Sequence, residues 1–97
     1  IVESATGRVA RSMAHYRPSC PIIAVVTSHK VCNKMSLIWG VTAVYGEEKK
    51  TSDAITRQAV EKALGTGLVN RGDTVIIISS NKTVPTAGTD SLYIRIV

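Results

Sequence analysis

Apolar residues occur along the chain in short blocks that differ in their spacing. Residues 21–26 and 74–78 form uninterrupted apolar runs, the pattern of strands that are buried on both faces of a parallel sheet. Residues 41–45 form a third short apolar run, and Ile1-Val2 resembles the end of a further strand. In residues 91–97 apolar and polar side chains alternate, which predicts an edge strand with one wetter face.

Between these runs, apolar residues recur every three or four positions and predict three helices, over residues 7–16, 29–38 and 52–64. Pro18 ends the first helix, because a proline forces the residue before it out of the helical region. Ser28 is a residue type that caps helix N-termini, and it precedes the second helix directly. Helices therefore alternate with strands over most of the chain.

This order, β-α-β-α-β-α-β-β, predicts an α/β fold in which helices cover both faces of a sheet. We expect a three-layer α/β/α sandwich with a mostly parallel, five-stranded sheet. The final connection is too short to contain a crossover helix, so the last strand is expected to be antiparallel. Residues 1–97 fit a single domain, whose first strand looks truncated at Ile1.

Charge and cysteine content narrow the classes of partner. The chain has 12 Lys and Arg against 7 Asp and Glu, a net charge of +5, which suits partners that bear phosphate. The basic residues are scattered, so nucleic-acid binding is not expected. No apolar run approaches the roughly 18–20 residues that span a bilayer, so no membrane partner is expected either. Cys20 and Cys32 lack metal-ligand spacing and are predicted to be buried as small hydrophobes.

Polar residues follow the predicted strands at their carboxyl ends, where ligands of such sheets gather. Thr27, Ser28, His29 and Lys30 combine hydroxyls and a cation with a helix N-terminus, a combination that suits a phosphate group. The alternative is that Thr27 and Ser28 only cap the helix while Lys30 is solvated. A second polar loop contains Asn81, Lys82 and Thr83. From it Lys82 could reach the same end of the sheet as residues 27–30.

Residues that could form an active site are scarce. The glycine-rich nucleotide motifs GxGxxG and GxxxxGK[ST] are missing, and no carboxylate pair of the kind that holds magnesium ends a strand. The two histidines, His15 and His29, cannot be tied by sequence to a nucleophile and an acid. We therefore predict neither catalytic nor metal-binding residues and expect the chain to be inactive as an enzyme by itself.

Several segments together resemble one known family over nearly the whole chain. They are TGRVAR, HYRPSCPIIAVV, LIWGV, GLVNRGDTVIII and AGTDSLYIRIV, in this order and at matching spacing. Each segment is weakly specific alone, but the set looks like the C-terminal domain of pyruvate kinase. The known domain is a three-layer α/β unit whose last strand is antiparallel, in agreement with the fold expected from the pattern.

The resemblance implies a division of labour within a larger cytoplasmic enzyme of glycolysis, which transfers phosphate from phosphoenolpyruvate to ADP. Catalytic residues, magnesium and potassium would lie in a separate barrel domain that this chain lacks, so the chain itself would hold no cofactor. It would be a regulatory and oligomerisation domain. A sugar phosphate effector would bind at residues 27–31 and be closed over by residues 80–89, and homo-oligomers would form through Ser91 to Val97.

Three positions depart from the family pattern. Val9 replaces a common Ser or Thr after the first Gly-Arg, and the other two lie in the expected phosphate cradle. Effector-binding members usually carry Thr or Ser where this chain has Val26 and Val31, so two hydroxyl donors are missing from the expected phosphate cradle. Hydrogen bonds to a charged group contribute about 1.5–3 kcal/mol each, so this loss would weaken binding strongly. A free-standing small α/β protein of the same fold, binding a phosphorylated metabolite for another purpose, is the alternative interpretation.

Overall fold

The fold follows the predicted order of strands and helices. A computed structural model describes residues 1–3, 7–48, 51–80 and 89–97. Along the chain the elements are β1 (Val2–Glu3), α1 (Arg8–His15), β2 (Ile22–Val26), α2 (His29–Met35), β3 (Val41–Tyr45), α3 (Ser52–Gly65), β4 (Thr74–Ser80) and β5 (Thr89–Ile96).

The strands form one five-stranded sheet in the order β3-β2-β1-β4-β5. β1 pairs in parallel with both β2 and β4, and β2 pairs in parallel with β3. β5 runs antiparallel to β4 and lies at the outer edge of the sheet. The predicted mostly parallel sheet with an antiparallel last strand is confirmed.

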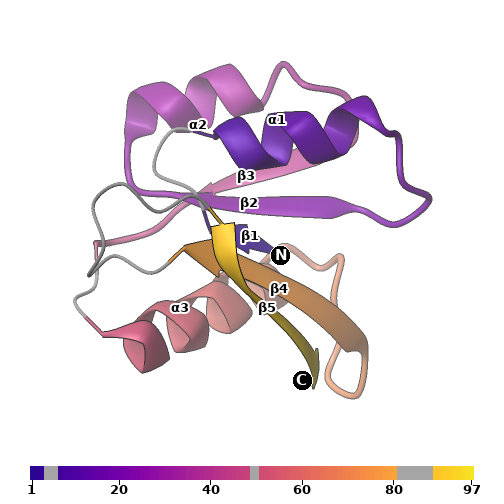
Figure 1. Cartoon of the computed structure of the whole chain (residues 1–97), viewed down its shortest axis with the longest axis vertical. Helices are drawn as coiled ribbons and strands as arrows, with labels where there is room; N and C mark the ends of the chain where they lie inside the picture. Colours follow the sequence, from indigo (N-terminus) through magenta and orange to yellow (C-terminus); the bar gives the residue numbers. More distant parts are fainter. Residues whose placement is uncertain (4–6, 49–50, 81–88) are drawn as a thin grey trace.

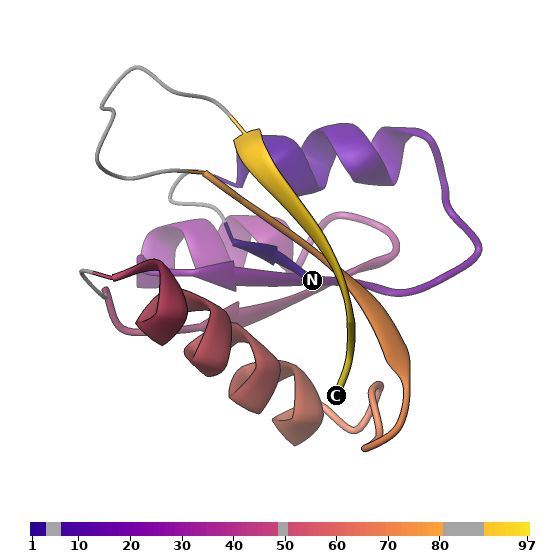
Figure 2. The same ribbon diagram turned by 60° about the horizontal axis from the view of Figure 1, so that its bottom comes forward.

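Helices lie on both sides of the sheet, so the three-layer arrangement is also confirmed. α1 and α2 lie on one side and α3 lies on the other (Figure 1), and the turned view in Figure 2 separates the same layers. β2 is buried along its whole length, as its uninterrupted apolar run predicted. Buried alanines bring the helices close to the sheet: Ala10 and Ala14 in α1, and Ala59 and Ala63 in α3.

The prediction that residues 74–78 are buried on both faces is wrong for one face. Val75 and Ile77 are buried, but Ile76 between them is 50% exposed. Successive side chains of a strand point to opposite faces, so one face of β4 is covered and the other is open to solvent. The contacts of α1 and α2 are mostly with β2 and β3, which leaves this face of β4 uncovered.

The open face continues onto β5. Ile94 pairs with Ile76, and Leu92 pairs with Ile78, so these side chains share a face. Ile94 is 72% exposed, and Leu92 and Ile96 are exposed to a similar degree. We call the side chains Ile76, Leu92, Ile94 and Ile96 the bare β4–β5 face. We expected only the polar face of β5, the edge strand, to be exposed. The apolar face, with Leu92, Ile94 and Ile96, is exposed to solvent as well.

Some element boundaries and one side chain differ from the predictions. α2 ends at Met35 instead of residue 38, because the Leu37 and Ile38 N–H groups donate to carbonyls only three residues back and so form a tighter turn. β4 and β5 are longer than predicted, because their antiparallel pairing continues through a bulge at Ser79/Ser80. Cys20 is exposed, contrary to the prediction, and Cys32 is half-buried.

Candidate functional site

The predicted phosphate loop lies where β2 and β3 end side by side. Val26, the last residue of β2, pairs with Tyr45, the last residue of β3. Gly46 continues from β3 and donates its N–H to Val26 O at 2.8 Å. Residues 27–30, which enter α2, therefore lie beside the start of the chain that leaves β3.

Ser28 has the capping role that the sequence suggested as the alternative. Its backbone is extended (φ −128°, ψ 130°), and its Oγ accepts a hydrogen bond from the Val31 N–H at 3.4 Å. The Cys32 N–H donates to Ser28 O at 2.9 Å. Thr27 and Ser28 are half-buried, whereas Lys30 is exposed. The Ser28 hydroxyl is thus already used by the helix, although its bond to the backbone is long.

His29 makes a contact that the sequence did not predict. Its imidazole stacks on the ring of Tyr45, with 3.8 Å between the ring centroids and 11° between the planes. The two residues are far apart in sequence, and only the parallel register of β2 with β3 brings them together. The stack holds the His29 ring over the end of β3. The imidazole therefore forms one side of the space beside residues 27–30.

The side-chain amide of Gln58 in α3 binds the segment that follows β3. The sequence did not indicate this role for Gln58. Gln58 Oε1 accepts from the Glu47 N–H, and Gln58 Nε2 donates to Glu47 O, both at 2.8 Å. Gly46, the residue before Glu47, lies in a tight space between Val25 and Gln58, because a Cβ there would be 2.9 Å from Val25 Cγ1 and 3.0 Å from Gln58 Nε2. A lone glutamine on an amphipathic helix carries no sequence signal for such a clamp.

The two departures in the expected phosphate cradle lie in different surroundings. Val26 has no exposed surface and belongs to the core beneath α1 and α2. Val31 is half-buried and packs against the same core from the first turn of α2. A hydroxyl at position 26 would therefore be fully buried, whereas one at position 31 would be only half-buried, on the residue whose backbone N–H donates to Ser28 Oγ.

The remaining predicted site residues, Asn81, Lys82 and Thr83, lie outside the described residues. The described residues of the loop, Thr27 to Lys30, supply hydroxyls, an imidazole and one cation. Within the described ranges, no three His, Cys, Asp or Glu side chains gather in the manner of a metal site. No helix in those ranges is long and apolar enough to cross a bilayer.

Comparison with known proteins agrees with this architecture. Residues 1–95 match the family model described as "Pyruvate kinase, alpha/beta domain". Over 97 residues the chain is 34% identical to a pyruvate kinase of Clostridium acetobutylicum, covering 100% of this chain and 20% of that protein. It is 40% identical over 87 residues to a pyruvate kinase of Sporosarcina psychrophila, covering 90% of this chain and 15% of that protein.

A pyruvate kinase of Bacillus licheniformis is 37% identical over 92 residues, which is 95% of this chain and 15% of that protein. The chain thus spans between 15% and 20% of the length of these three relatives. The match extends over almost the whole chain, and the five-stranded sheet and its antiparallel last strand agree with the expected fold. The chain therefore belongs to the family of the pyruvate kinase α/β domain.

Proposed function

We propose that this chain acts as the non-catalytic regulatory and assembly domain of a pyruvate kinase. The observation that carries the proposal is the family match over residues 1–95 in a chain that spans only a fifth or less of its relatives. The phosphoryl transfer from phosphoenolpyruvate to ADP, with its magnesium and potassium, then belongs to another domain of a cytoplasmic enzyme. The 97 residues alone should show no kinase activity.

The first part of the proposal is that residues 27–30 bind the phosphate group of a sugar phosphate effector. Lys30 supplies an exposed positive charge, and Thr27 and Ser28 supply hydroxyls at the same helix end. His29 stands beside them on Tyr45 and would contribute a ring N–H. Charge-assisted hydrogen bonds of this kind are about twice as strong as neutral ones, so Lys30 is the main contributor.

Calorimetric titration with a sugar bisphosphate tests this binding. Ser28→Asp keeps a residue that caps helices well but places a carboxylate at the site, so it should abolish binding without unfolding α2. Lys30→Gln should weaken binding about tenfold. The matched control is Lys62→Gln in the last turn of α3, which should bind as the original chain does. Absence of heat and of a thermal shift at millimolar ligand would overturn the effector site.

The second part is that homo-oligomers form through Ser91 to Val97. Val97 donates its N–H to Asp73 O, toward β4. Because N–H groups alternate in direction along an antiparallel strand, Ile94 directs its N–H to the outer edge, where another strand can pair with it. Ile94→Pro removes this donor, whereas Ile94→Thr keeps it. Sedimentation should show that only the proline variant loses the oligomer; a monomer at high concentration in the unaltered chain would contradict this part.

A further inference from the structure

We propose that the outer face of α1 and α2 docks on the surface of a membrane that contains anionic lipids. Three cations and three exposed apolar side chains form this face, which we call the outer α1–α2 face: Arg11, Arg17, Lys34, Tyr16, Leu37 and Trp39. The expectation of no membrane partner rested on the lack of a bilayer-spanning run, but a folded domain can also lie on a membrane surface.

The net charge of the chain comes from one part of it. Between Glu3 and Glu47 there are five Lys and Arg residues and no Asp or Glu, so this segment carries the whole net charge of +5. The rest of the chain contains seven basic and seven acidic residues and is neutral overall. Both α1 and α2 belong to the basic segment, and they lie on the side of the sheet opposite α3 (Figure 1). The domain therefore has one positive side, formed by these two helices.

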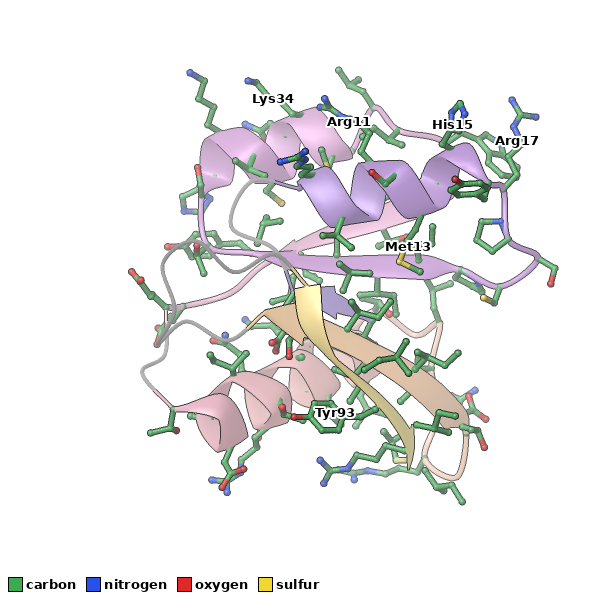
Figure 3. The ribbon with its side chains drawn as sticks, viewed as in Figure 1. Arg11, Met13, His15, Arg17, Lys34 and Tyr93 are labelled. Carbon is green, nitrogen blue, oxygen red and sulfur yellow. The ribbon has the colours of Figure 1, made fainter. Side chains whose placement is uncertain are left out.

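The cations of this face point away from the protein. Figure 3 shows Arg11, Arg17 and Lys34 on the outer side of the α1 and α2 layer, whereas Met13 points toward β2. All three cations are exposed, and none forms an ion pair with a residue that the structure describes. Lys34 balances the dipole of α2 from its last turn, but the dipole does not account for Arg11 in the middle of α1. An anionic surface would balance all three charges.

Large apolar side chains stand among these cations. Leu37 is 88% exposed, Tyr16 is 84% exposed and Trp39 is 68% exposed, although side chains of these types usually bury most of their surface. Ile38, between Leu37 and Trp39, packs against the core, so the turn after α2 directs its two other apolar side chains outward. Tryptophan and tyrosine are enriched where proteins meet lipid headgroups, because each ring has an apolar body and a polar end.

The apolar and cationic side chains are neighbours. The Arg17 Cζ lies over the Trp39 ring, 5.3 Å from its centroid. The Leu37 N–H donates to Lys34 O at 3.3 Å, so these two residues are one turn apart. Four of the six residues line one depression: Arg11, Tyr16, Arg17 and Trp39. Long basic side chains can keep their charge at the headgroups while apolar side chains enter the layer beneath, so a membrane would contact both kinds at once.

Two features favour a membrane over another anionic partner. An extended anionic surface repels every carboxylate on the side that meets it, and the segment between Glu3 and Glu47 has none. A partner protein would need to avoid carboxylates only at its own contact points. Leu37 favours lipid over a nucleic acid, because an aliphatic side chain gains free energy on leaving water but offers no ring on which a base stacks.

Vesicles test the proposal directly. The 97-residue chain should co-sediment with vesicles of equal parts phosphatidylglycerol and phosphatidylcholine, and should bind vesicles of phosphatidylcholine alone at least about tenfold more weakly. The emission of Trp39, the one tryptophan of the sequence, should shift to shorter wavelength as its ring leaves water. Lack of binding to the anionic vesicles, or binding without this shift, would overturn the proposal.

Charge variants separate the outer α1–α2 face from general attraction by a basic protein. Each Lys or Arg at an anionic surface contributes about fivefold in affinity, so Arg11→Gln combined with Lys34→Gln should weaken binding about 25-fold. The matched control is Arg57→Gln combined with Lys62→Gln, which removes the same charge from exposed positions of α3. It should bind nearly normally, because charges more than about 10 Å from the membrane are screened. Equal weakening by the two pairs would overturn the proposal.

Apolar variants and soluble polyanions identify the contact and the class of partner. Leu37→Ser should weaken vesicle binding about tenfold without loss of fold, because Leu37 is exposed. Ile94→Ser, on the bare β4–β5 face, is the control and should bind normally. Weakening by Ile94→Ser instead of Leu37→Ser would place the contact on the other face and overturn the proposal. Binding of polyglutamate or of an RNA oligonucleotide as tightly as vesicles would indicate a protein or nucleic-acid partner and would also overturn it.

Discussion

The imidazole of His29 lies flat against the ring of Tyr45, with 3.8 Å between their centroids and 11° between their planes. His29 is the first residue of α2, and Tyr45 is the last residue of β3. The contact therefore ties a helix start to the end of a strand at the rim where the effector is proposed to bind. It fixes one wall of that loop in the absence of ligand.

Removing one ring of this pair should lower stability measurably. Tyr45→Ala is expected to cost about 1 kcal/mol, a typical contribution of an aromatic pair, and to lower Tm by about 4–8 °C. Tyr45→Phe keeps the stacked ring and serves as the control. Thermal unfolding of His29→Ala, Tyr45→Ala and the double variant gives the coupling between the rings. Strictly additive losses would show that the stack contributes nothing.

The start of α1 packs closely against the end of α2 on the same side of the sheet, through Gly7 and Met35. Gly7 precedes α1 with φ +79°, and a Cβ there would lie 2.6 Å from Met35 Sδ. Met35 is completely buried at the end of α2. Gly7→Ala combines a left-handed backbone with displacement of a core side chain, so it should cost more than about 2 kcal/mol in denaturant unfolding.

Gly67→Ala is the matched control for this variant. Gly67 has the same φ of +79°, but a Cβ there would meet no atom within 4 Å. It therefore reports the backbone cost alone, about 1 kcal/mol. If both variants lose the same stability, the packing of Met35 against Gly7 is not restrictive.

The exposure of the bare β4–β5 face can be tested by comparing Ile94 of β5, which lies on this face, with Ile77 of β4, which lies on the covered face. Ile77 has no exposed surface, so Ile77→Ser should cost about 3–5 kcal/mol. Ile94 is 72% exposed, and Ile94→Ser should change stability by no more than about 0.5 kcal/mol. The same Ile94→Ser variant should bind less of a hydrophobic dye such as ANS and aggregate less. A large loss of stability in Ile94→Ser would show that this face is covered.

Much of the fold could be predicted from the sequence because local patterns and topology rules agree. The uninterrupted run at residues 21–26 predicted a strand buried on both faces, and β2 is one. The same rule failed for residues 74–78, because burial of a strand depends on which helices reach it. The three helices that follow strands in this chain leave the last strand pair uncovered on one face. Sequence periodicity reports apolar character but does not report which element covers it.

The candidate site could be predicted only in part, for a related reason. Ser28 was identified as a cap from its residue type, because capping is a local interaction. The stack of His29 on Tyr45 and the clamp of Gln58 on Glu47 depend on register and helix placement, so they join residues that are distant in sequence. Asn81, Lys82 and Thr83 remain predictions.

The two valines that replace family hydroxyls in the expected phosphate cradle should respond differently when the hydroxyl is restored. Val31→Thr places a half-buried hydroxyl in the first turn of α2, on the residue whose backbone N–H donates to Ser28 Oγ, with little change in shape. A hydrogen bond to a charged group contributes about 1.5–3 kcal/mol, so the affinity for a sugar bisphosphate should rise about tenfold or more. Val26→Thr buries its hydroxyl in the core, so it should cost about 1–3 kcal/mol of stability and leave affinity unchanged. Calorimetry and thermal unfolding of both variants check this difference. A gain in affinity from Val26→Thr without loss of stability would mean that the ligand reaches beneath the loop, which the burial of Val26 contradicts.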